Sequence, residues 1–173
     1  MSDQDIWAGD IHRVLSRHGV RQVAYVPDAG HRALIDLCRA DAGLTAVPLT
    51  TEEEGVALLA GAWLGGDKGV LLMQSSGVGN CVNLFSLARV CRFPLLLLIT
   101  MRGQWGEFNP WQVPMGRNTE PVLALADVLT FGVEDGDQVG ETVDAAARMV
   151  FNGPAMAAVL LSQRLIGSKT FGR

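Results

Sequence analysis

The chain has 173 residues, a formal net charge of −4, 49% hydrophobic residues and 18% charged residues. A chain of this length is expected to form one domain with a substantial core. The negative charge gives no electrostatic basis for binding nucleic acid, and the low share of charged residues suggests that another subunit covers part of the surface.

The sequence also bears on the compartment. The longest apolar run, around residues 94–99, is too short to span a bilayer, and the N-terminus lacks a basic segment followed by an apolar one. The three cysteines are odd in number and lack C-x-x-C spacing, which favours reduced thiols. We therefore expect a cytoplasmic protein that binds neither a membrane nor nucleic acid.

The first part of the chain alternates between helical and strand patterns. Apolar spacing predicts a helix over residues 3–19, a strand over 22–26, a helix over 32–40 and a strand over 45–49. Such alternation is typical of a parallel sheet with crossover helices.

Ligand-facing residues are expected where the first predicted strand ends. Loops at the carboxyl ends of parallel strands commonly carry ligands, and Asp28 and His31 follow this strand directly. Asp28 is therefore either a catalytic or substrate-facing residue or, as the pattern alone slightly favours, a turn or helix-capping aspartate.

An acidic run, Glu52 to Glu54, opens the third predicted helix. Thr51 as N-cap and Glu54 three residues later form the pattern of a capping box, and the helix dipole favours carboxylates in a first turn. This interpretation explains Glu52 and Glu54 well, but it explains Glu53 less well.

Glu53 instead heads a line of small and apolar residues. At ~100° per residue, Glu53, Ala57, Ala60 and Leu64 fall within about 40° of one line along the helix. We predict that this line belongs to the apolar face, that Glu53 is buried there with a raised pKa, and that it can meet a backbone or a flat ring closely.

A glycine-rich stretch from Gln74 to Asn80 follows a strand predicted over residues 70–74 and precedes a helix predicted to begin near Asn80, with Asn83 in its first turn. Glycines in this position let a ligand approach the backbone and the free N–H groups of the helix. A tight turn without a ligand explains the pattern equally well. The stretch is not a dinucleotide-binding fingerprint, because Val82 stands where a third glycine would be. It is not a phosphate-binding Walker motif either, because the lysine of that motif does not follow.

The second half of the chain continues the alternation. The predicted elements are a central strand over 94–100, a helix over 120–129, a strand over 130–134, a helix over 139–151 and a strand over 154–161. We predict an α/β fold, a three-layer α/β/α doubly wound parallel sheet, over residues 1–165, followed by a C-terminal tail over 166–173.

Residues 102–117 contain several glycines, prolines and aromatic residues and are predicted to form a long irregular loop. Loops of this length are usually functional or disordered, and the aromatic residues argue against simple disorder. Arg102 follows a strand end, so it either meets an anionic substrate group or pairs with Glu107 or an acid at an interface.

Several motifs, each weak alone, are specific as a set. They are Tyr25-Val26-Pro27-Asp28, Glu52-Glu53-Glu54-Gly55, Leu72-Met73-Gln74-Ser75-Ser76-Gly77-Val78-Gly79-Asn80, Pro94-Leu95-Leu96-Leu97-Leu98-Ile99, Arg102-Gly103-Gln104-Trp105-Gly106-Glu107 and Gln112-Val113-Pro114-Met115-Gly116-Arg117. Over nearly the whole chain, this set resembles the pyrimidine-binding (PYR) domain of thiamine diphosphate enzymes, in the branch of the sulfopyruvate and phosphonopyruvate decarboxylases.

The resemblance implies the α subunit of a decarboxylase that acts on a small anionic 2-oxo acid, sulfopyruvate or phosphonopyruvate. It implies that Glu53 binds N1′ of the aminopyrimidine of thiamine diphosphate, and that Asp28 and His31 join it as catalytic candidates. It implies substrate contacts from Arg102 and Gln112. The further cofactor-binding residues that it implies are Gln74, Ser76, Gly77, Val78, Gly79, Asn80 and Asn83.

The resemblance also implies a partner. The G-D-G motif and downstream asparagine that hold the diphosphate and Mg²⁺ in such enzymes do not occur here. We therefore expect no metal ligands in this chain, a separate β subunit that binds Mg²⁺ and the diphosphate, and a hetero-oligomer.

Two other interpretations stay open: a carboligase subunit of the acetolactate synthase type, and a non-catalytic regulatory subunit of the same fold. Departures from the family pattern at Glu52, Ser75 and Gln104-Trp105 leave open whether the substrate carries a sulfonate, a phosphonate or a carboxylate.

Overall fold

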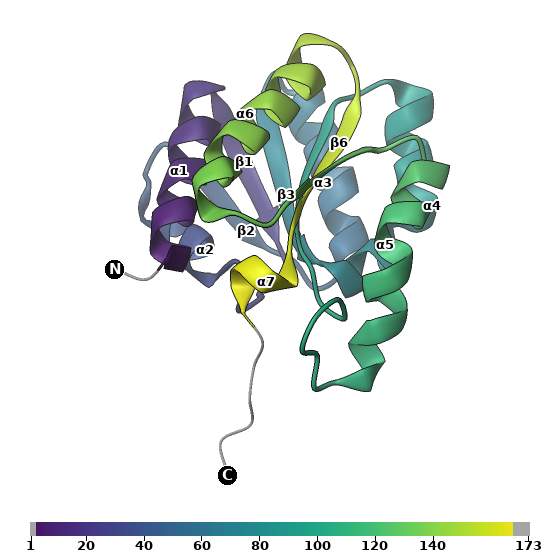
Figure 1. Ribbon diagram of the computed structural model, residues 1–173. Coiled ribbons are helices and arrows are strands. Elements are labelled where there is room, and N and C mark those ends of the chain that lie inside the picture. The colour runs from purple at the N-terminus through teal and green to yellow at the C-terminus, as the bar shows by residue number, and fades with distance from the viewer. Residues whose placement is uncertain (1–2, 168–173) are drawn as a thin grey trace.

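The computed structural model describes residues 3–167 of the chain. Six parallel strands form one sheet in the order β2-β1-β3-β4-β6-β5, with helices on both of its faces (Figure 1). The predicted doubly wound parallel sheet is therefore confirmed. The part of the predicted tail after residue 167 lies outside the described residues.

The strands are β1 (Val20–Tyr25), β2 (Thr45–Pro48), β3 (Lys68–Gln74), β4 (Leu95–Thr100), β5 (Leu129–Val133) and β6 (Met156–Leu161). The helices are α1 (Asp3–Arg17), α2 (Arg32–Ala40), α3 (Glu52–Leu64), α4 (Ser75–Cys91), the 3-10 helix η1 (Pro110–Gln112), α5 (Val113–Leu125), α6 (Gly136–Asn152) and α7 (Gln163–Ile166). Within residues 3–167, no helix has both the length and the apolar character of a membrane span.

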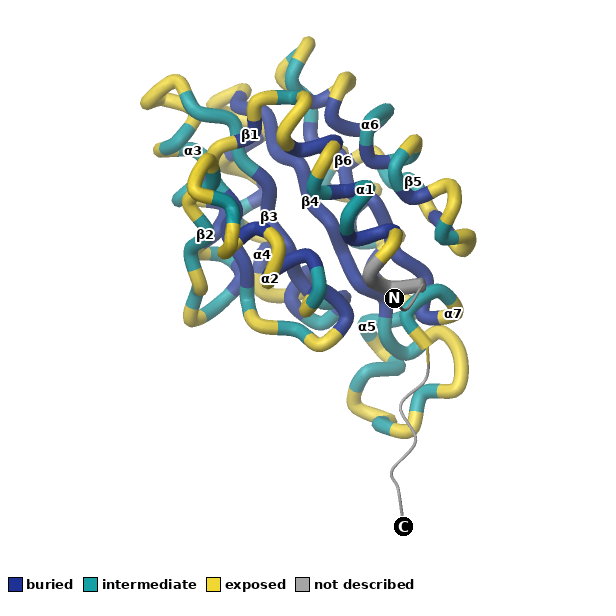
Figure 2. The backbone as a smooth tube through the Cα atoms, turned by 90° about the vertical axis from the view of Figure 1, so that its left-hand side faces the viewer, coloured by how far each residue is buried: buried dark blue, intermediate teal, exposed yellow. Residues whose placement is uncertain are grey.

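Two apolar clusters fill the space between the sheet and its helices. α1, α2 and α6 close the cluster on one face, and α3, α4 and α5 close the cluster on the other. β4 supplies alternate side chains to both clusters, and all of its residues are buried, as expected of a central parallel strand. Figure 2 shows the inner strands β1, β3, β4 and β6 as the buried centre of the molecule, whereas the edge strands β2 and β5 are mostly intermediate or exposed.

The glycine-rich stretch after β3 is helical, which corrects the predicted turn. α4 begins at Ser75 and not near Asn80, and neither Gly77 nor Gly79 has a positive φ. A Cβ at Gly77 would lie 2.5 Å from the carboxyl carbon of Glu52. The glycine is therefore needed for the close approach of α3 to α4.

The segment after β4 also contains more helix than predicted. η1 begins at Pro110 and α5 at Val113, within the predicted loop, and α5 ends at Leu125. Pro114 stands in the first turn of α5, where an N–H group would have no partner within the helix, so a proline is tolerated there. The prolines that suggested a loop instead mark the starts of two helices.

Two glycines hold the remaining loop, residues 101–109, against the start of α5. Gly103 has φ of +75°, and a Cβ there would lie 2.3 Å from the carbonyl oxygen of Gln112. A Cβ at Gly116 would lie 2.3 Å from the carbonyl oxygen of Arg102. The backbone of the loop and the backbone at the start of α5 therefore pack so closely that neither position has space for a Cβ atom.

Replacing Gly103 with alanine should therefore destabilise the chain by about 3 kcal/mol, the combined cost of a left-handed backbone and an overpacked contact. The measurement is urea-induced unfolding. Gly61→Ala in α3 is the matched control, because nothing lies within 4 Å of a Cβ at that position; this variant should be equally stable or gain up to about 1 kcal/mol. Equal unfolding free energies for Gly103→Ala and the wild type would contradict the packing described here.

Candidate functional site

The carboxyl ends of the strands meet at one edge of the sheet, where the direction of winding reverses. β1 leads through α2 to β2 on one side, whereas β3 leads through α4 to β4 on the other. The crevice between two such strands is the usual ligand site of open α/β sheets. Asp28 follows β1 and Gln74 ends β3, so the topology brings both predicted site residues to this crevice.

Asp28 is bound to the end of β4. The hydroxyl of Thr100, a residue that is 1% exposed, donates a hydrogen bond to Oδ2 of Asp28. The N-cap residue of α2 is His31, so Asp28 does not cap the helix. The backbone carbonyl of Asp28 accepts a hydrogen bond from the N–H of His31 at 3.2 Å, which agrees with the turn position that the pattern also allowed. The half-buried carboxylate of Asp28 joins the ends of two strands.

His31 lies beneath this surface and is fully buried. Its Nε2–H donates to the carbonyl oxygen of Leu98 at 3.0 Å, while Nδ1 has no hydrogen-bond partner among the described residues. Burial lowers the pKa of the imidazole despite the nearby Asp28 carboxylate. The ring is therefore neutral at physiological pH and supports the strand ends from within.

The structure corrects the predicted orientation of α3. Its buried face is one stripe of residues at helical spacing: Glu52, Gly55, Val56 and Leu59. Glu53 is only half-buried, and Ala57 and Leu64 on the same side are exposed. The prediction that Glu53 lies on the core-facing side is wrong, because the neighbouring stripe faces the sheet.

The Glu53 carboxylate lies half-buried in the first turn of α3, where a ligand can reach it. Its Oε2 accepts a hydrogen bond from the hydroxyl of Thr51, which holds the pKa of Glu53 below its ordinary value. A raised pKa was predicted, so that expectation fails for the chain alone. Among the described residues, no cation forms a salt bridge with Glu53. The predicted capping box of Thr51 and Glu54 is present.

Glu52, which the sequence assigned only to the helix dipole, is the buried acid of this helix. It is 8% exposed, and its Oε2 accepts a hydrogen bond of 2.7 Å from the side-chain amide of Asn80 on α4. Its carboxyl group occupies the space beside Gly77. Glu52 therefore has a structural role in joining α3 to α4.

The predicted cofactor residues on β3 and α4 divide into two groups. Exposed or half-buried ones are Gln74, Ser76, Gly79, Asn80 and Asn83. Gly77 and Val78 are buried, and Val78 belongs to the core between α3, α4 and α5. The predicted contact of these two residues with a cofactor is not supported by their burial.

Arg102 is paired with Glu107, one of the two alternatives that the sequence left open. Its Nε and Nη2 donate to Oε2 and Oε1 of Glu107 at 2.7 and 2.6 Å, and the side chains are 14% and 3% exposed. Its Nη1 lies 3.5 Å from Oε1 of Gln74. One edge of the guanidinium is thus bound to Glu107, and the other is directed toward Gln74.

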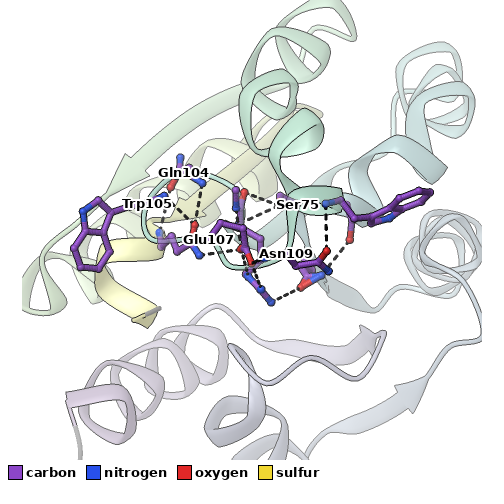
Figure 3. Close-up of polar contacts among 11 residues, drawn as sticks. Ser75, Gln104, Trp105, Glu107 and Asn109 are labelled. Atoms are coloured by element: carbon purple, nitrogen blue, oxygen red, sulfur yellow. Dashed lines mark hydrogen bonds and ion pairs between the residues drawn. The ribbon is translucent and has the colours of Figure 1, made fainter. Parts of the chain in front are cut away.

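Further polar contacts fix the loop that carries Arg102 (Figure 3). Gln163 on α7, which the sequence analysis did not single out, accepts hydrogen bonds from the backbone N–H groups of Gln104 and Trp105 at 2.9 and 3.0 Å. Gln112, predicted to bind substrate, has a buried Oε1 that lacks a partner among the described residues. No sequence motif indicated Gln163, because its partners lie far away in the chain.

Within residues 3–167, no three His, Cys, Asp or Glu side chains lie together in a way that could hold a metal ion. Cys38 and Cys81 are buried free thiols. Burial raises the pKa of both to about 12, so neither is a reactive thiolate.

The model of the N-terminal thiamine pyrophosphate (TPP) binding domain of thiamine pyrophosphate enzymes matches residues 8–107. The chain belongs to this family. This TPP-binding domain is 33% identical over 152 residues to sulfopyruvate decarboxylase subunit alpha of Methanococcus maripaludis, a match that covers 87% of this chain and 91% of that subunit. It is 37% identical over 145 residues to phosphonopyruvate decarboxylase of Streptomyces viridochromogenes, covering 83% of this chain but only 36% of that protein.

The fold of the TPP-binding domain also occurs in a 2-oxoglutarate:ferredoxin oxidoreductase from Magnetococcus marinus. The TM-score is 0.71 at 14% identity, over 96% of this chain and 29% of that one. This similarity shows the fold alone. The relatives confirm the predicted family and class: the chain is a homologue of TPP-dependent decarboxylase subunits, and its similarity to an α subunit implies a partner subunit.

The Arg102–Glu107 pair should make the stability of the domain depend on pH. Hydrogen bonds from Arg102 lower the pKa of the Glu107 carboxyl from 4.5 to about 2. The unfolded chain therefore binds this proton first as pH falls, so the stabilisation is complete above about pH 4.5 and is lost as the pH falls toward about 2. Glu107→Gln should unfold at lower urea than the wild type at pH 7 and should lose less stability between about pH 4.5 and 2.5.

Urea midpoints at a series of pH values test this. Glu141→Gln, at an exposed position on α6, is the control and should follow the wild type at each pH. Parallel pH profiles for Glu107→Gln and the wild type would show that Glu107 is not ionised against Arg102.

Proposed function

We propose that this chain is the α subunit of a thiamine diphosphate-dependent 2-oxo acid decarboxylase, with sulfopyruvate or phosphonopyruvate as substrate. A separate β subunit completes the active site and supplies the diphosphate and Mg²⁺ sites. The observation that carries the proposal is the homology over 91% of a sulfopyruvate decarboxylase α subunit. The accessible carboxylate of Glu53 in the first turn of α3 supports the proposal.

The residues at the N-terminal end of α3 fit the pyrimidine half of the cofactor. Within residues 3–167, the acceptor positions of Glu53 are used only from its own helix start, and Ala57, one turn along, is exposed and too small to keep a flat ring away. Gln74, Ser76 and Asn80 place amide and hydroxyl groups at the end of β3 and the start of α4. These groups can bind the polar edge of a heterocycle.

Thiamine diphosphate, when bound, supplies the electron sink that accepts the electron pair left when a 2-oxo acid releases carbon dioxide. Glu53 holds a proton in a hydrogen bond to the pyrimidine nitrogen N1′. Burial of its carboxyl at the subunit boundary removes water and raises its pKa above the lowered value of the chain alone. The low dielectric of a covered site strengthens this hydrogen bond.

The remaining predicted residues act on the substrate side of the crevice. Asp28, whose carboxylate accepts a hydrogen bond from Thr100, is assigned to hold or deliver a proton at the reacting carbon, and His31 is assigned to fix the strand ends beneath it as a neutral ring. The edge of Arg102 that faces Gln74, and Oε1 of Gln112, which has no partner within residues 3–167, are assigned to substrate orientation. A guanidinium is the natural partner of a sulfonate or phosphonate.

The β subunit is expected to cover the exposed side of α3. Besides Ala57, this side presents Trp63 and Leu64, whose exposed fractions are 37% and 88%. Exposed apolar side chains along one side of a helix are typical of a subunit boundary. The assembly is therefore a hetero-oligomer in which Glu53 becomes buried.

Glu53→Gln tests the central assignment. In the αβ complex, kcat/KM for the 2-oxo acid should fall by about 100-fold or more, since the amide cannot hold the proton at N1′. Carbon dioxide release from sulfopyruvate, phosphonopyruvate and pyruvate is the measurement. Glu54→Gln is the matched control one residue away, because glutamine also completes a capping box, and this variant should keep wild-type activity.

Full activity of Glu53→Gln would remove the assignment of this residue. Release of carbon dioxide with a carbon–carbon ligation product, instead of an aldehyde, would replace the decarboxylase with a carboligase. No carbon dioxide from the wild-type complex with any of the three acids would overturn the proposed function.

A further inference from the structure

Arg102 offers one edge to the candidate site because the other is bound. A guanidinium carries five N–H donors, and Glu107 accepts one from Nε and one from Nη2. Nη1 donates to Oε1 of Gln74 at 3.5 Å, and Gln74 ends β3 in the crevice that also contains Asp28. The direction of the donors that remain therefore depends on what fixes Glu107.

Glu107 is fixed from three other positions besides Arg102. Its Oε1 accepts a hydrogen bond from the backbone N–H of Asn109 at 3.0 Å, and its Oε2 accepts from the backbone N–H of Gly103 at 3.2 Å. The third is the side-chain amide of Gln163, whose Nε2 donates to Oε2 at 3.0 Å. The two backbone donors belong to the same loop as Arg102. Among these donors, only Gln163 connects the Glu107 carboxylate to another part of the fold.

Gln163 connects the loop to the end of β6. It is 1% exposed and stands in α7, directly after the strand. Its Oε1 accepts from the N–H groups of Gln104 and Trp105, and its own N–H donates to Oε1 of Gln104 at 3.1 Å. Both the oxygen and the nitrogen of the buried side-chain amide are used, and each of these contacts ends on the Arg102 loop, whose residues Gln104, Trp105 and Glu107 are labelled in Figure 3.

We propose that Gln163 is a positioning residue that, through Glu107, holds Arg102 in the orientation that binds the anionic substituent of the 2-oxo acid. This inference rests on the proposed function. It assigns to α7 a part in substrate affinity, although Gln163 itself touches neither substrate nor cofactor. A misplacement of about 1 Å at a binding group is enough to weaken substrate binding strongly.

Gln163→Met in the αβ complex is the first test, since methionine has a similar length and no strong hydrogen-bonding group. KM for the anionic 2-oxo acid should rise about tenfold, with kcat changed less than about threefold. Hydrogen exchange of the Gln104 and Trp105 amides should be faster, because they lose their acceptor. Gln138→Met at an exposed position of α6 is the matched control and should change neither quantity.

Gln163→Glu separates a positioning role from a merely structural one. The introduced carboxyl keeps the acceptor for the two loop amides, and burial next to Glu107 raises its pKa. When protonated it can donate to Glu107 as glutamine does. KM should therefore be close to the wild-type value near about pH 6 and should rise relative to the wild type toward about pH 8, while amide protection is kept.

The outcomes separate the inference from the proposed function. If the wild-type complex releases carbon dioxide but Gln163→Met has the KM of the wild type, the inference is overturned and the proposed function stands. A loss of kcat with unchanged KM would likewise overturn it. If the wild-type complex decarboxylates none of the acids, the proposed function fails first and the inference falls with it.

Discussion

The contact of Glu52 with Gly77 and Asn80 determines how α3 and α4 pack on the sheet. A buried carboxylate needs a donor and space, and here the amide of Asn80 gives the one and the missing side chain of Gly77 gives the other. Because Glu52 is turned inward, Glu53, the next residue of the helix, is turned outward. The same contact holds the first turns of α4 against the start of α3.

The second organising element is the carboxylate of Glu107. It accepts hydrogen bonds from the backbone N–H groups of Gly103 and Asn109 in the loop and from the side-chain amide of Gln163 on α7. The loop is thereby tied both to itself and to α7. Charge-assisted hydrogen bonds to a buried carboxylate are stronger than neutral ones, and the low pKa of Glu107 expresses the same fact. The close approach of Gly103 to Gln112 fixes the other side of the loop. An irregular segment can therefore hold the Arg102 side chain in a defined orientation through hydrogen bonds.

The sequence predicted the sheet, its helices and the family, because periodicity and strand–helix alternation are local signals. The bounds of α2 were predicted correctly, and the fully apolar β4 indicated a central strand. The starts of α4 and α5 were missed, since glycine and proline are ambiguous in a first helical turn.

The site was predictable only in part. The topology placed Asp28 and Gln74 together, as expected from two strand ends, but no sequence rule could decide which of three consecutive glutamates faces the sheet. That choice depends on Gly77 and Asn80, more than twenty residues away in the chain. Gln163 was missed for the same reason, because its partners belong to a distant loop.

The ionised state of Glu53 in the lone chain has a consequence for how the subunits come together. A surface that covers this carboxylate must either bring a donor with it or let the group take up a proton, because an unpaired buried charge is costly. By linkage, a step that takes up a proton is favoured by acid and opposed by base. In the assembly proposed above, the affinity between the subunits in the presence of cofactor would then depend on pH, with the Glu53 carboxyl as the titrating group.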